Sequence, residues 1–508
     1  MAKSAKSGSE HLLTLNYQSK AIFGNIARLC VAMLCLCFSA CDKPAANATP
    51  MPAPKVAAQV DKKVDKNTIQ TTVKKNVITF VTMNSPNTYF VDGNQQFAGL
   101  EYDLAKLFVK ELGNDYQLNF IVVDEFAKVL PTILANKADI AAADITVTKS
   151  RKKLVNFSDS YLDVRQQVAY NRDVSPPPRK LAALKGAHIT IPADTSFAER
   201  LSDLSKEQDL TWEEQQNTNS EKLLASLANR EIDYTIVDNH MLSTMQYYYP
   251  NVGMGFTIGE PEKIAWALPK NADPVLASKV TAFFKKIKGN GALNNLVDRY
   301  HGNTQRLNPF DVKSFLYYSK IRLPKYIHLF KDAQNVTEID WRLLAALSYQ
   351  ESHWNTFNTS PTNVRGLMML TEDTSDMMKV SNRLDPKQSV PAGAKFYLWL
   401  KERLPDRVPE PDRTFMALAA YNIGIGHVED ARILAQRLKL NPDSWVDVKK
   451  TLVMLSDPKY FKHAKYGYCS GGAPVIYVES IRSYYSILTR FEPAYDPVQD
   501  SFKIASAE

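Results

Sequence analysis

The chain has 508 residues, 45% of them hydrophobic and 23% charged, so it is long enough for about two to four globular domains and is not a generally disordered protein. Its net charge of +8 comes from 62 basic and 54 acidic side chains, and the basic residues are spread along the sequence. Such a balance is compatible with contact with anionic surfaces, but no nucleic-acid-binding motif accompanies it. We therefore expect no nucleic-acid partner.

Four of the five cysteines lie close together in the apolar run "IARLCVAMLCLCFSAC", which follows basic residues. The run is shorter than the about 20 residues that a membrane-spanning helix needs, and this length favours a signal peptide over residues 1–41. Its end, "FSAC", resembles a bacterial lipobox with Phe38 in place of the usual Leu, and the resemblance implies lipidation at Cys41. An uncleaved hydrophobic anchor is the alternative. Cys469 stands alone, so a disulfide framework is not expected.

Both interpretations export the rest of the chain and anchor it to a membrane. We expect it at the periplasmic face of the cell envelope, at the outer membrane rather than the inner one. Asp42 follows Cys41 directly. Because an aspartate there favours retention at the inner membrane in some bacteria, that alternative stays open.

Residues 42–75 are rich in Pro, Ala, Lys and polar residues, a composition that predicts a flexible tether. Strands then alternate with helices, which predicts a parallel α/β sheet. In chain order the segments are "VITFVTM" (strand), "FAGLEYDLAKLFVKELG" (helix), "YQLNFIVVD" (strand), "FAKVLPTILANKA" (helix) and "DIAAADI" (strand). The alternation repeats from "KGAHITIPAD" through "SEKLLASLANR" to "DYTIVD", so residues 76–303 are expected to form two α/β lobes.

Three stretches in this region, "GLEYDLAKLFVKELG", "ADITVTKSRKKLVNFSDSYL" and "REIDYTIVDN", resemble the family 3 periplasmic solute-binding proteins. The resemblance implies a two-lobed, periplasmic-binding-protein-like fold. It also implies that Thr146 and Arg151 bind a ligand carboxylate and that Asp238 holds its ammonium group. The alternatives are a solvated Arg151 at a helix start and a turn or cap role for Asp238. Asp144 and Asp194 stand where many members have Ser or Gly, which disfavours a second ligand carboxylate.

Strand signals disappear near residue 310, so residues 304–495 are predicted to form a mainly α domain, followed by a tail over 496–508. One helix is expected to begin at Thr337 as N-cap. In it, Leu344, Leu347 and Glu351 are spaced by three and four residues, which places Glu351 on the buried side. Burial there raises the pKa of a carboxyl group toward the value that a general acid needs.

Four motifs follow one another in this region: "ES" at 351–352, "RGLMML" at 365–370, "ALAAYNIGIGHV" at 417–428 and "YGYCSGGAPVIYVESI" at 466–481. Together they resemble the lytic transglycosylases of the soluble type, whose fold is related to that of goose-type lysozyme. The resemblance implies a lysozyme-like transglycosylase domain. Its implied site residues are Glu351 as catalytic acid and base, Ser352 and Met368 as substrate contacts, and Tyr421, Asn422 and Tyr477 lining the site. For residues 368–370 and for Tyr477, plain packing is the alternative.

The implied reaction cleaves the β-1,4 bond between N-acetylmuramic acid and N-acetylglucosamine in peptidoglycan and leaves 1,6-anhydro ends, without consuming water. No cofactor is implied, and no metal or nucleotide motif is present. Glu372 and Asp373 are candidates for a second acid, although "TEDTS" is more typical of a helix start. Hydrolysis by a lysozyme-like route is one alternative. A membrane-tethered receptor for an amino acid or a muropeptide, with a non-catalytic glycan-binding domain, is the other.

Overall fold

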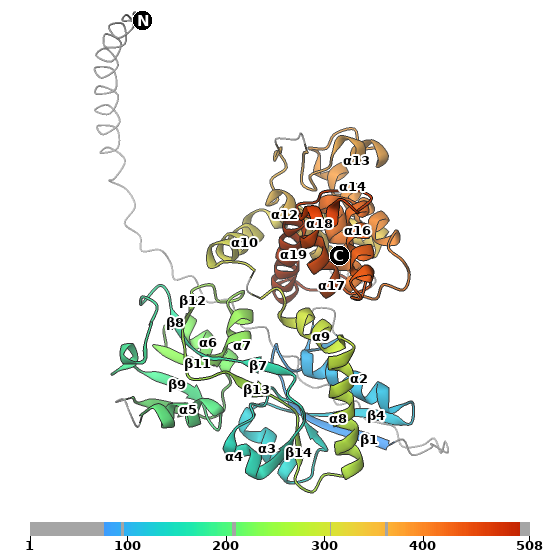
Figure 1. Cartoon of the computed structure of the whole chain (residues 1–508). Coiled ribbons are helices and arrows are strands. Elements are labelled where there is room, and N and C mark those ends of the chain that lie inside the picture. The colour runs from blue at the N-terminus through green and yellow to red at the C-terminus, as the bar shows by residue number, and fades with distance from the viewer. Residues whose placement is uncertain (1–75, 93–95, 206–209, 305, 361–363, 498–508) are drawn as a thin grey trace, which may run out of the picture. The chain divides into compact units, whose positions relative to one another are not determined.

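The computed structural model describes residues 76–92, 96–205, 210–304, 306–360 and 364–497 (Figure 1). Cys41, the predicted signal peptide and the predicted tether over 42–75 lie outside the described residues, as does nearly all of the predicted tail. Within the described ranges no helix combines the length and the apolar character needed to cross a bilayer.

An α/β domain, formed by the elements from β1 to α9, contains two five-stranded sheets, one in each lobe. The first sheet has the order β4 (Tyr116–Val123), β1 (Asn76–Met83), β5 (Ile140–Ala141), β14 (Ala267–Pro269), β6 (Val155–Phe157). The second has the order β10 (Trp212–Gln215), β9 (Ile189–Pro192), β11 (Tyr234–Asp238), β8 (Gln166–Asn171), β12 (Val252–Thr257). The predicted two-lobed α/β fold is therefore confirmed.

The expectation of purely parallel sheets is wrong for one strand in each. β14 runs antiparallel to β5 and β6, and β8 runs antiparallel to β11 and β12. Each is the first strand of its sheet that the chain forms after it crosses from the other lobe. The crossings pass through β7 (Leu162–Val164) and β13 (Glu262–Ile264), which pair with each other in antiparallel fashion.

Helices cover the sheets of both lobes (Figure 1). Those of the first lobe are α2 (Leu100–Leu112), η1 (Phe126–Lys128), α3 (Val129–Leu134), α4 (Lys149–Leu154), α8 (Pro274–Gly289) and α9 (Ala292–His301). Those of the second lobe are η2 (Leu181–Leu184), α5 (Ser196–Ser205), α6 (Ser220–Ala228) and α7 (Asn239–Met245). A small hairpin, β2 (Phe90–Val91) and β3 (Phe97–Ala98), precedes α2. α9 contacts α2 and α8, so the chain finishes the α/β domain in the first lobe.

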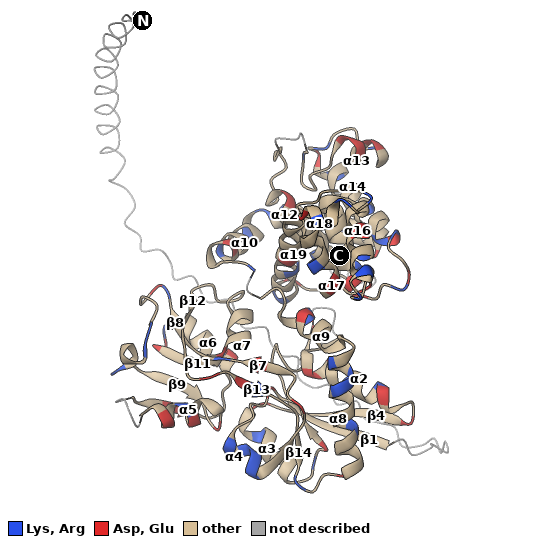
Figure 2. Ribbon diagram, in the orientation of Figure 1, with Lys and Arg blue, Asp and Glu red and all other residues tan. Residues whose placement is uncertain are grey.

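The remainder, from α10 onward, is a helical domain with one large apolar core. Its elements are α10 (Pro309–Ile321), η3 (Leu323–Lys325), α11 (Ile327–Thr337), α12 (Trp341–Ser352), α13 (Glu372–Met377), α14 (Pro386–Glu402), α15 (Asp412–Ile423), α16 (Ile425–Arg437), α17 (Trp445–Met454), α18 (Pro458–Phe461) and α19 (Gly472–Phe491). α19 contacts α12, α15 and α17 and so runs through this core. Basic and acidic residues are distributed over both domains (Figure 2).

The start of α12 differs from the prediction. Thr337 is the last residue of α11, and its hydroxyl donates to Ala333 O at 2.8 Å. Glu338 then adopts a left-handed conformation, with φ 58°, which ends that helix. Asp340 is the true N-cap of α12, because its carboxylate accepts from the amide of Arg342 at 2.8 Å.

Candidate active site and candidate ligand site

Glu351 lies in the last turn of α12, directly before the chain leaves the helix. His353 and Trp354 form the exit with φ angles of 52° and 54°. The indole of Trp354 is buried, and its Nε1 donates to Ala345 O at 2.9 Å, which folds the exit back against the helix. The side chain of Glu351 is thereby held at the edge of the apolar core.

The carboxylate of Glu351 accepts a hydrogen bond from the hydroxyl of Tyr477 in α19. Burial raises the pKa of Glu351 to about 7, and the Tyr477 hydroxyl opposes that rise because it stabilises the charged form. Among the described residues no charged side chain contributes to this pKa. A pKa near neutral pH suits a group that first donates and then accepts a proton.

Ser352 is buried, and its hydroxyl lies within hydrogen-bond distance of Leu367 O at 2.9 Å and Ser348 O at 3.1 Å. Ser348, one turn earlier on the same face of α12, also donates to Leu367 O, at 3.0 Å. Two hydroxyls thus fix one carbonyl of the segment 365–370 to the helix that carries Glu351. Ser348 was not among the predicted site residues, although its spacing from Ser352 would have indicated it.

Tyr421, from α15, fixes the next residue of that segment. Its hydroxyl donates to Met368 O at 2.8 Å, and the Met368 amide donates to Ser389 Oγ at 3.2 Å. The Met368 side chain is fully buried against Gly393 of α14, where an added Cβ would lie 2.6 Å from Met368 Cβ. Burial, and then the charge of Glu351, raises the pKa of Tyr421.

The structure therefore brings together the side chains of Glu351, Tyr421 and Tyr477 with the backbone of Met368. Asn422 is exposed at the following position of α15. The side chain of Met368 belongs to the core, as the packing alternative has it, so only its backbone is free to border a cleft. The substrate contacts of Ser352, Met368 and Asn422 remain predictions.

The two acids considered as a second catalytic carboxylate are Glu372 and Asp373. Both are exposed in the first turn of α13. Thr371 caps this helix, because its Oγ1 accepts from the amide of Thr374 at 3.1 Å. The interpretation of "TEDTS" as a helix start is confirmed.

A cavity in the α/β domain is lined by residues of both lobes, among them the predicted ligand contacts Thr146, Arg151 and Asp238. Arg151 is 4% exposed and stacks on Phe126 at 4.8 Å, so the solvated alternative for this residue is wrong. Its guanidinium donates to Thr146 O at 3.0 Å and to Asp194 O at 3.2 Å. Some of the hydrogen-bond donors of the Arg151 guanidinium are thus already used to hold the backbone of Thr146, which lines the cavity, and of Asp194.

Asp238 lies at the N-cap position of α7, but its side chain makes no capping hydrogen bond. The carboxyl is buried, one of its oxygens has no hydrogen-bond partner among the described residues, and burial raises its pKa to about 7. Nearby, Asp144 pairs with His240 Nε2 at 2.7 Å, and although burial alone would raise the pKa of Asp144, His240 holds it below its usual value. The pocket therefore offers an unsatisfied acid to a cationic or hydrogen-bond-donating group.

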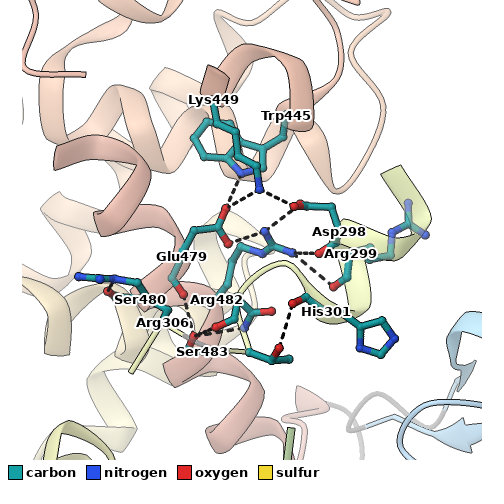
Figure 3. A network of polar contacts seen from close by, with 12 residues as sticks. Asp298, Arg299, His301, Arg306, Trp445, Lys449, Glu479, Ser480, Arg482 and Ser483 are labelled. Atoms are coloured by element: carbon teal, nitrogen blue, oxygen red, sulfur yellow. Dashed lines mark hydrogen bonds and ion pairs between the residues drawn. The ribbon is translucent and has the colours of Figure 1, made fainter. Parts of the chain in front are cut away.

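A polar network joins α19 to the α/β domain (Figure 3). Arg482 of α19 donates to the side chain of Asp298 at 3.1 Å and to its backbone oxygen at 2.6 Å, and Lys449 of α17 pairs with the same carboxylate. Glu479 accepts from Arg482 at 2.5 Å and from Lys449 at 3.2 Å, so that the carboxylates of Asp298 and Glu479 together balance the two cations. Asp298 lies in α9, so the network connects α19 to the first lobe.

The second lobe reaches the same helix through two other residues. The hydroxyl oxygen of Tyr247, a residue that follows α7, lies 3.0 Å from Ser483 Oγ. Arg490, near the end of α19, pairs with Glu221 at the start of α6, and Glu221 lines the cavity. Arg490 and Glu221 are 269 positions apart, and no sequence signal linked them.

Two family models match the chain. That of the bacterial extracellular solute-binding proteins, family 3, covers residues 77–303, and that of the transglycosylase SLT domain covers residues 328–442. Over 430 residues the chain is 51% identical to a membrane-bound lytic murein transglycosylase F of Methylobacillus flagellatus, with 84% of this chain and 91% of the relative covered. A protein of the same name from Nitrosospira multiformis is 42% identical over 423 residues, or 83% of this chain and 87% of the relative.

Among solved structures, an ancestral arginine-binding protein bound to arginine superposes with a TM-score of 0.41 and 21% sequence identity. The superposition covers 45% of this chain and 99% of that chain.

Proposed function

The chain belongs to the family of membrane-bound lytic murein transglycosylases F, and from this premise we propose how its own residues cleave peptidoglycan. It is a lyase that acts on peptidoglycan, is associated with a membrane and faces the periplasm, and carries a solute-binding domain ahead of its transglycosylase domain. The finer points, namely the product, the catalytic groups and the task of the solute-binding domain, are proposals.

In the first step, protonated Glu351 donates its proton to the oxygen between N-acetylmuramic acid and N-acetylglucosamine, and the bond from that oxygen to the muramyl C1 breaks. Positive charge develops on the muramyl ring as an oxocarbenium-like species. In the second step, ionised Glu351 takes the proton of the muramyl C6 hydroxyl, whose oxygen bonds to C1 and closes a 1,6-anhydro ring. No water is consumed, and Glu351 ends protonated as it began.

The observation that carries this proposal is the surroundings of the Glu351 carboxyl group. Its pKa is raised to about 7 by burial, and a neutral Tyr477 hydroxyl is its hydrogen-bond donor. Most glycosidases use two carboxylates across the bond. A single buried acid with no charged partner among the described residues suits a mechanism in which the substrate supplies its own nucleophile.

The other groups of the site position this acid and the substrate. Tyr477 orients the carboxylate and stabilises it once the proton has left. Tyr421 and Ser352 hold the backbone of residues 367–368, which we propose as a border of the glycan cleft. Asn422 is exposed and is proposed as a direct contact with the sugar.

Mass spectrometry of peptidoglycan digested by the chain from Lys43 onward, with and without Glu351→Gln, tests the reaction. We expect 1,6-anhydro products from the parent and a fall in product release of roughly 10²–10⁴-fold in the variant. A reducing-end product, heavier by one water molecule, would show that the enzyme hydrolyses the bond. Undiminished anhydro product from the variant would remove Glu351 from the mechanism.

We further propose that the solute-binding domain regulates cleavage by binding an amino acid or a muropeptide in the cavity that contains Arg151 and Asp238. The support is the position of Glu221, which lines that cavity and pairs with Arg490 of α19, the helix that also carries Tyr477. A ligand that changes the position of α6 therefore acts on a helix that touches the catalytic carboxylate. Calorimetry with amino acids and purified muropeptides tests binding, and product release with and without the bound compound tests regulation.

The domain limits remain those expected from the sequence: a signal peptide over 1–41, a tether over 42–75, a solute-binding domain over 76–303, a transglycosylase domain over 304–495 and a tail over 496–508. We propose lipidation at Cys41 and the outer membrane as the site of attachment. Mass spectrometry of the N-terminal peptide of the membrane fraction, and separation of the two membranes by density, test these points.

A further inference from the structure

The first helix of the helical domain, α10, exposes large apolar side chains on its outward face. Phe310, Tyr317 and Ile321 are 77%, 60% and 45% exposed, and their spacing of seven and four residues places them along one stripe. The opposite face carries Val312 and Phe315, which are buried in the core of the domain. The outward stripe is therefore not needed to attach the helix to its own domain.

This concentration of exposed apolar residues is peculiar to α10. Single exposed hydrophobic residues are common on soluble proteins and need no explanation. Every other described helix has at most one large hydrophobic residue among the exposed ones, whereas α10 has three.

Basic residues flank the stripe. Lys313 and Lys320 are exposed on the same side of the helix, and Lys325 is exposed in the turn that follows. Figure 2 shows the basic residues on α10. The one acid of the helix, Asp311, belongs to the capping box with Asn308.

The pairing of Lys313 does not remove its charge from the surface. It lies 3.6 Å from Asp173, and both side chains remain about half exposed. Such exposed pairs contribute little to stability, so the lysine can exchange its partner at low cost.

We propose that α10 lies on an anionic membrane surface, with Phe310, Tyr317 and Ile321 in the headgroup region and the lysines beside lipid phosphates. Aromatic and aliphatic residues along one stripe with lysines at its edge are typical of helices in the membrane interface. Anionic lipids attract each lysine of such a helix, and the family is membrane-associated, so a bilayer is always near. The proposal goes beyond peptidoglycan cleavage and ligand sensing, since it concerns where the helical domain is held.

The test uses the chain from Lys43 onward, which lacks the anchor segment but keeps every described residue. We expect it to sediment with vesicles of phosphatidylcholine and phosphatidylglycerol, more weakly with phosphatidylcholine alone, and less as salt is added. The combined variant Phe310→Ser, Tyr317→Ser and Ile321→Ser should lower the vesicle partition coefficient by roughly tenfold or more. Lys313→Glu with Lys320→Glu should abolish the preference for the anionic vesicles.

The control removes exposed apolar side chains from three other helices: Val275→Ser, Val336→Ser and Val453→Ser. It should bind vesicles as the parent does. Thermal unfolding and product release show that each variant is folded. The proposal is overturned if the parent binds no vesicles, or if the α10 variant and the control bind equally well. It is also overturned if sedimentation velocity shows that the stripe joins two copies of the chain and that this pairing accounts for its effect.

Discussion

The hydroxyl of Tyr477 donates to the carboxylate of Glu351, which joins α19 to the end of α12 at the proposed catalytic group. Tyr477→Phe removes this bond to the charged form, so the pKa of Glu351 should rise further. Because the ionised carboxylate loses a stabilising hydrogen bond, we expect kcat at neutral pH to fall by about tenfold. Because the pKa rises, the alkaline limb of the pH profile should move to higher pH.

The control for this variant is Tyr485→Phe. It lies on the same helix and also loses a hydrogen bond to a carboxylate, that of Asp340 at 2.8 Å. It should alter stability but leave the pH profile in place. Equal shifts in both variants would mean that α19 as a whole, and not the Tyr477 hydroxyl, sets the pKa.

Glu351→Gln should stabilise the folded chain at alkaline pH. The pKa of Glu351 rises from its ordinary value near 4.5 to about 7 on folding, so between these values the folded state holds a proton that the unfolded state has lost. Stability therefore falls as pH rises through this window, by on the order of 2 kcal/mol for this group after allowance for its partial exposure. Denaturant unfolding should show the variant to be the more stable above pH 7 and equal to the parent below pH 4.5. A constant difference at all pH values would contradict the buried state of the carboxyl group.

Ser348→Ala and Ser352→Ala separate positioning from substrate contact. Both hydroxyls donate to Leu367 O, so each substitution should cost about 1 kcal/mol of unfolding free energy. The two substitutions should also lower product release to a similar extent. If Ser352 also touches the substrate, kcat/KM should fall much further in Ser352→Ala than in Ser348→Ala. Equal kinetic losses would assign Ser352 to positioning alone.

Binding of an amine ligand by the solute-binding domain should weaken as pH falls below about 7. Burial raises the pKa of Asp238 to that value, and its protonated form no longer attracts an ammonium group. The groups that also act on it are His240, Asp144, Glu262 and Arg151. Calorimetry above and below this pH should show the loss in the parent, and Asp238→Asn should bind weakly at both. A pH dependence that survives in Asp238→Asn would point to the Asp144 and His240 pair instead.

Glu221→Gln or Arg490→Met should uncouple the ligand from product release. Either change removes the ion pair between the cavity wall and α19. Arg490→Met lies outside the pocket and should leave the ligand affinity close to that of the parent. It should reduce the change in product release that the ligand causes. Arg306→Gln, which removes a 3.3 Å hydrogen bond to Ser480 of the same helix, is the control and should keep the response. An unchanged response in Arg490→Met would show that coupling follows another route.

The sequence predicted what depends on local spacing. The two α/β lobes, the helical domain and the buried side of α12 up to Glu351 follow from apolar periodicity, which reports burial directly. The start of α12 was misplaced at Thr337 because Thr and Asp are both good caps. The left-handed turn at Glu338 that decides between them has no glycine to mark it.

Contacts between distant segments were the part that local patterns could not give. The resemblance supplied Tyr477 and Arg151, but not that Arg151 already binds two backbone carbonyls. Nor did it indicate the pair of Glu221 and Arg490, because a salt bridge between two domains produces no periodic pattern in the sequence of either segment. The antiparallel strands β8 and β14 were missed for a related reason, since strand direction follows from the path of the chain between lobes.

That path has a mechanical consequence. The two crossings of the chain between lobes are the short strands β7 and β13, so a rotation of one lobe against the other is carried by a narrow hinge. α19 is attached to the first lobe through Asp298 and to the second through Glu221 and Tyr247. α19 thus links the two lobes from outside the α/β domain, and these links resist both opening and closing of the lobes. Movement of the lobes must bend α19, shift it along the core of the helical domain, or break one of its polar contacts with a lobe.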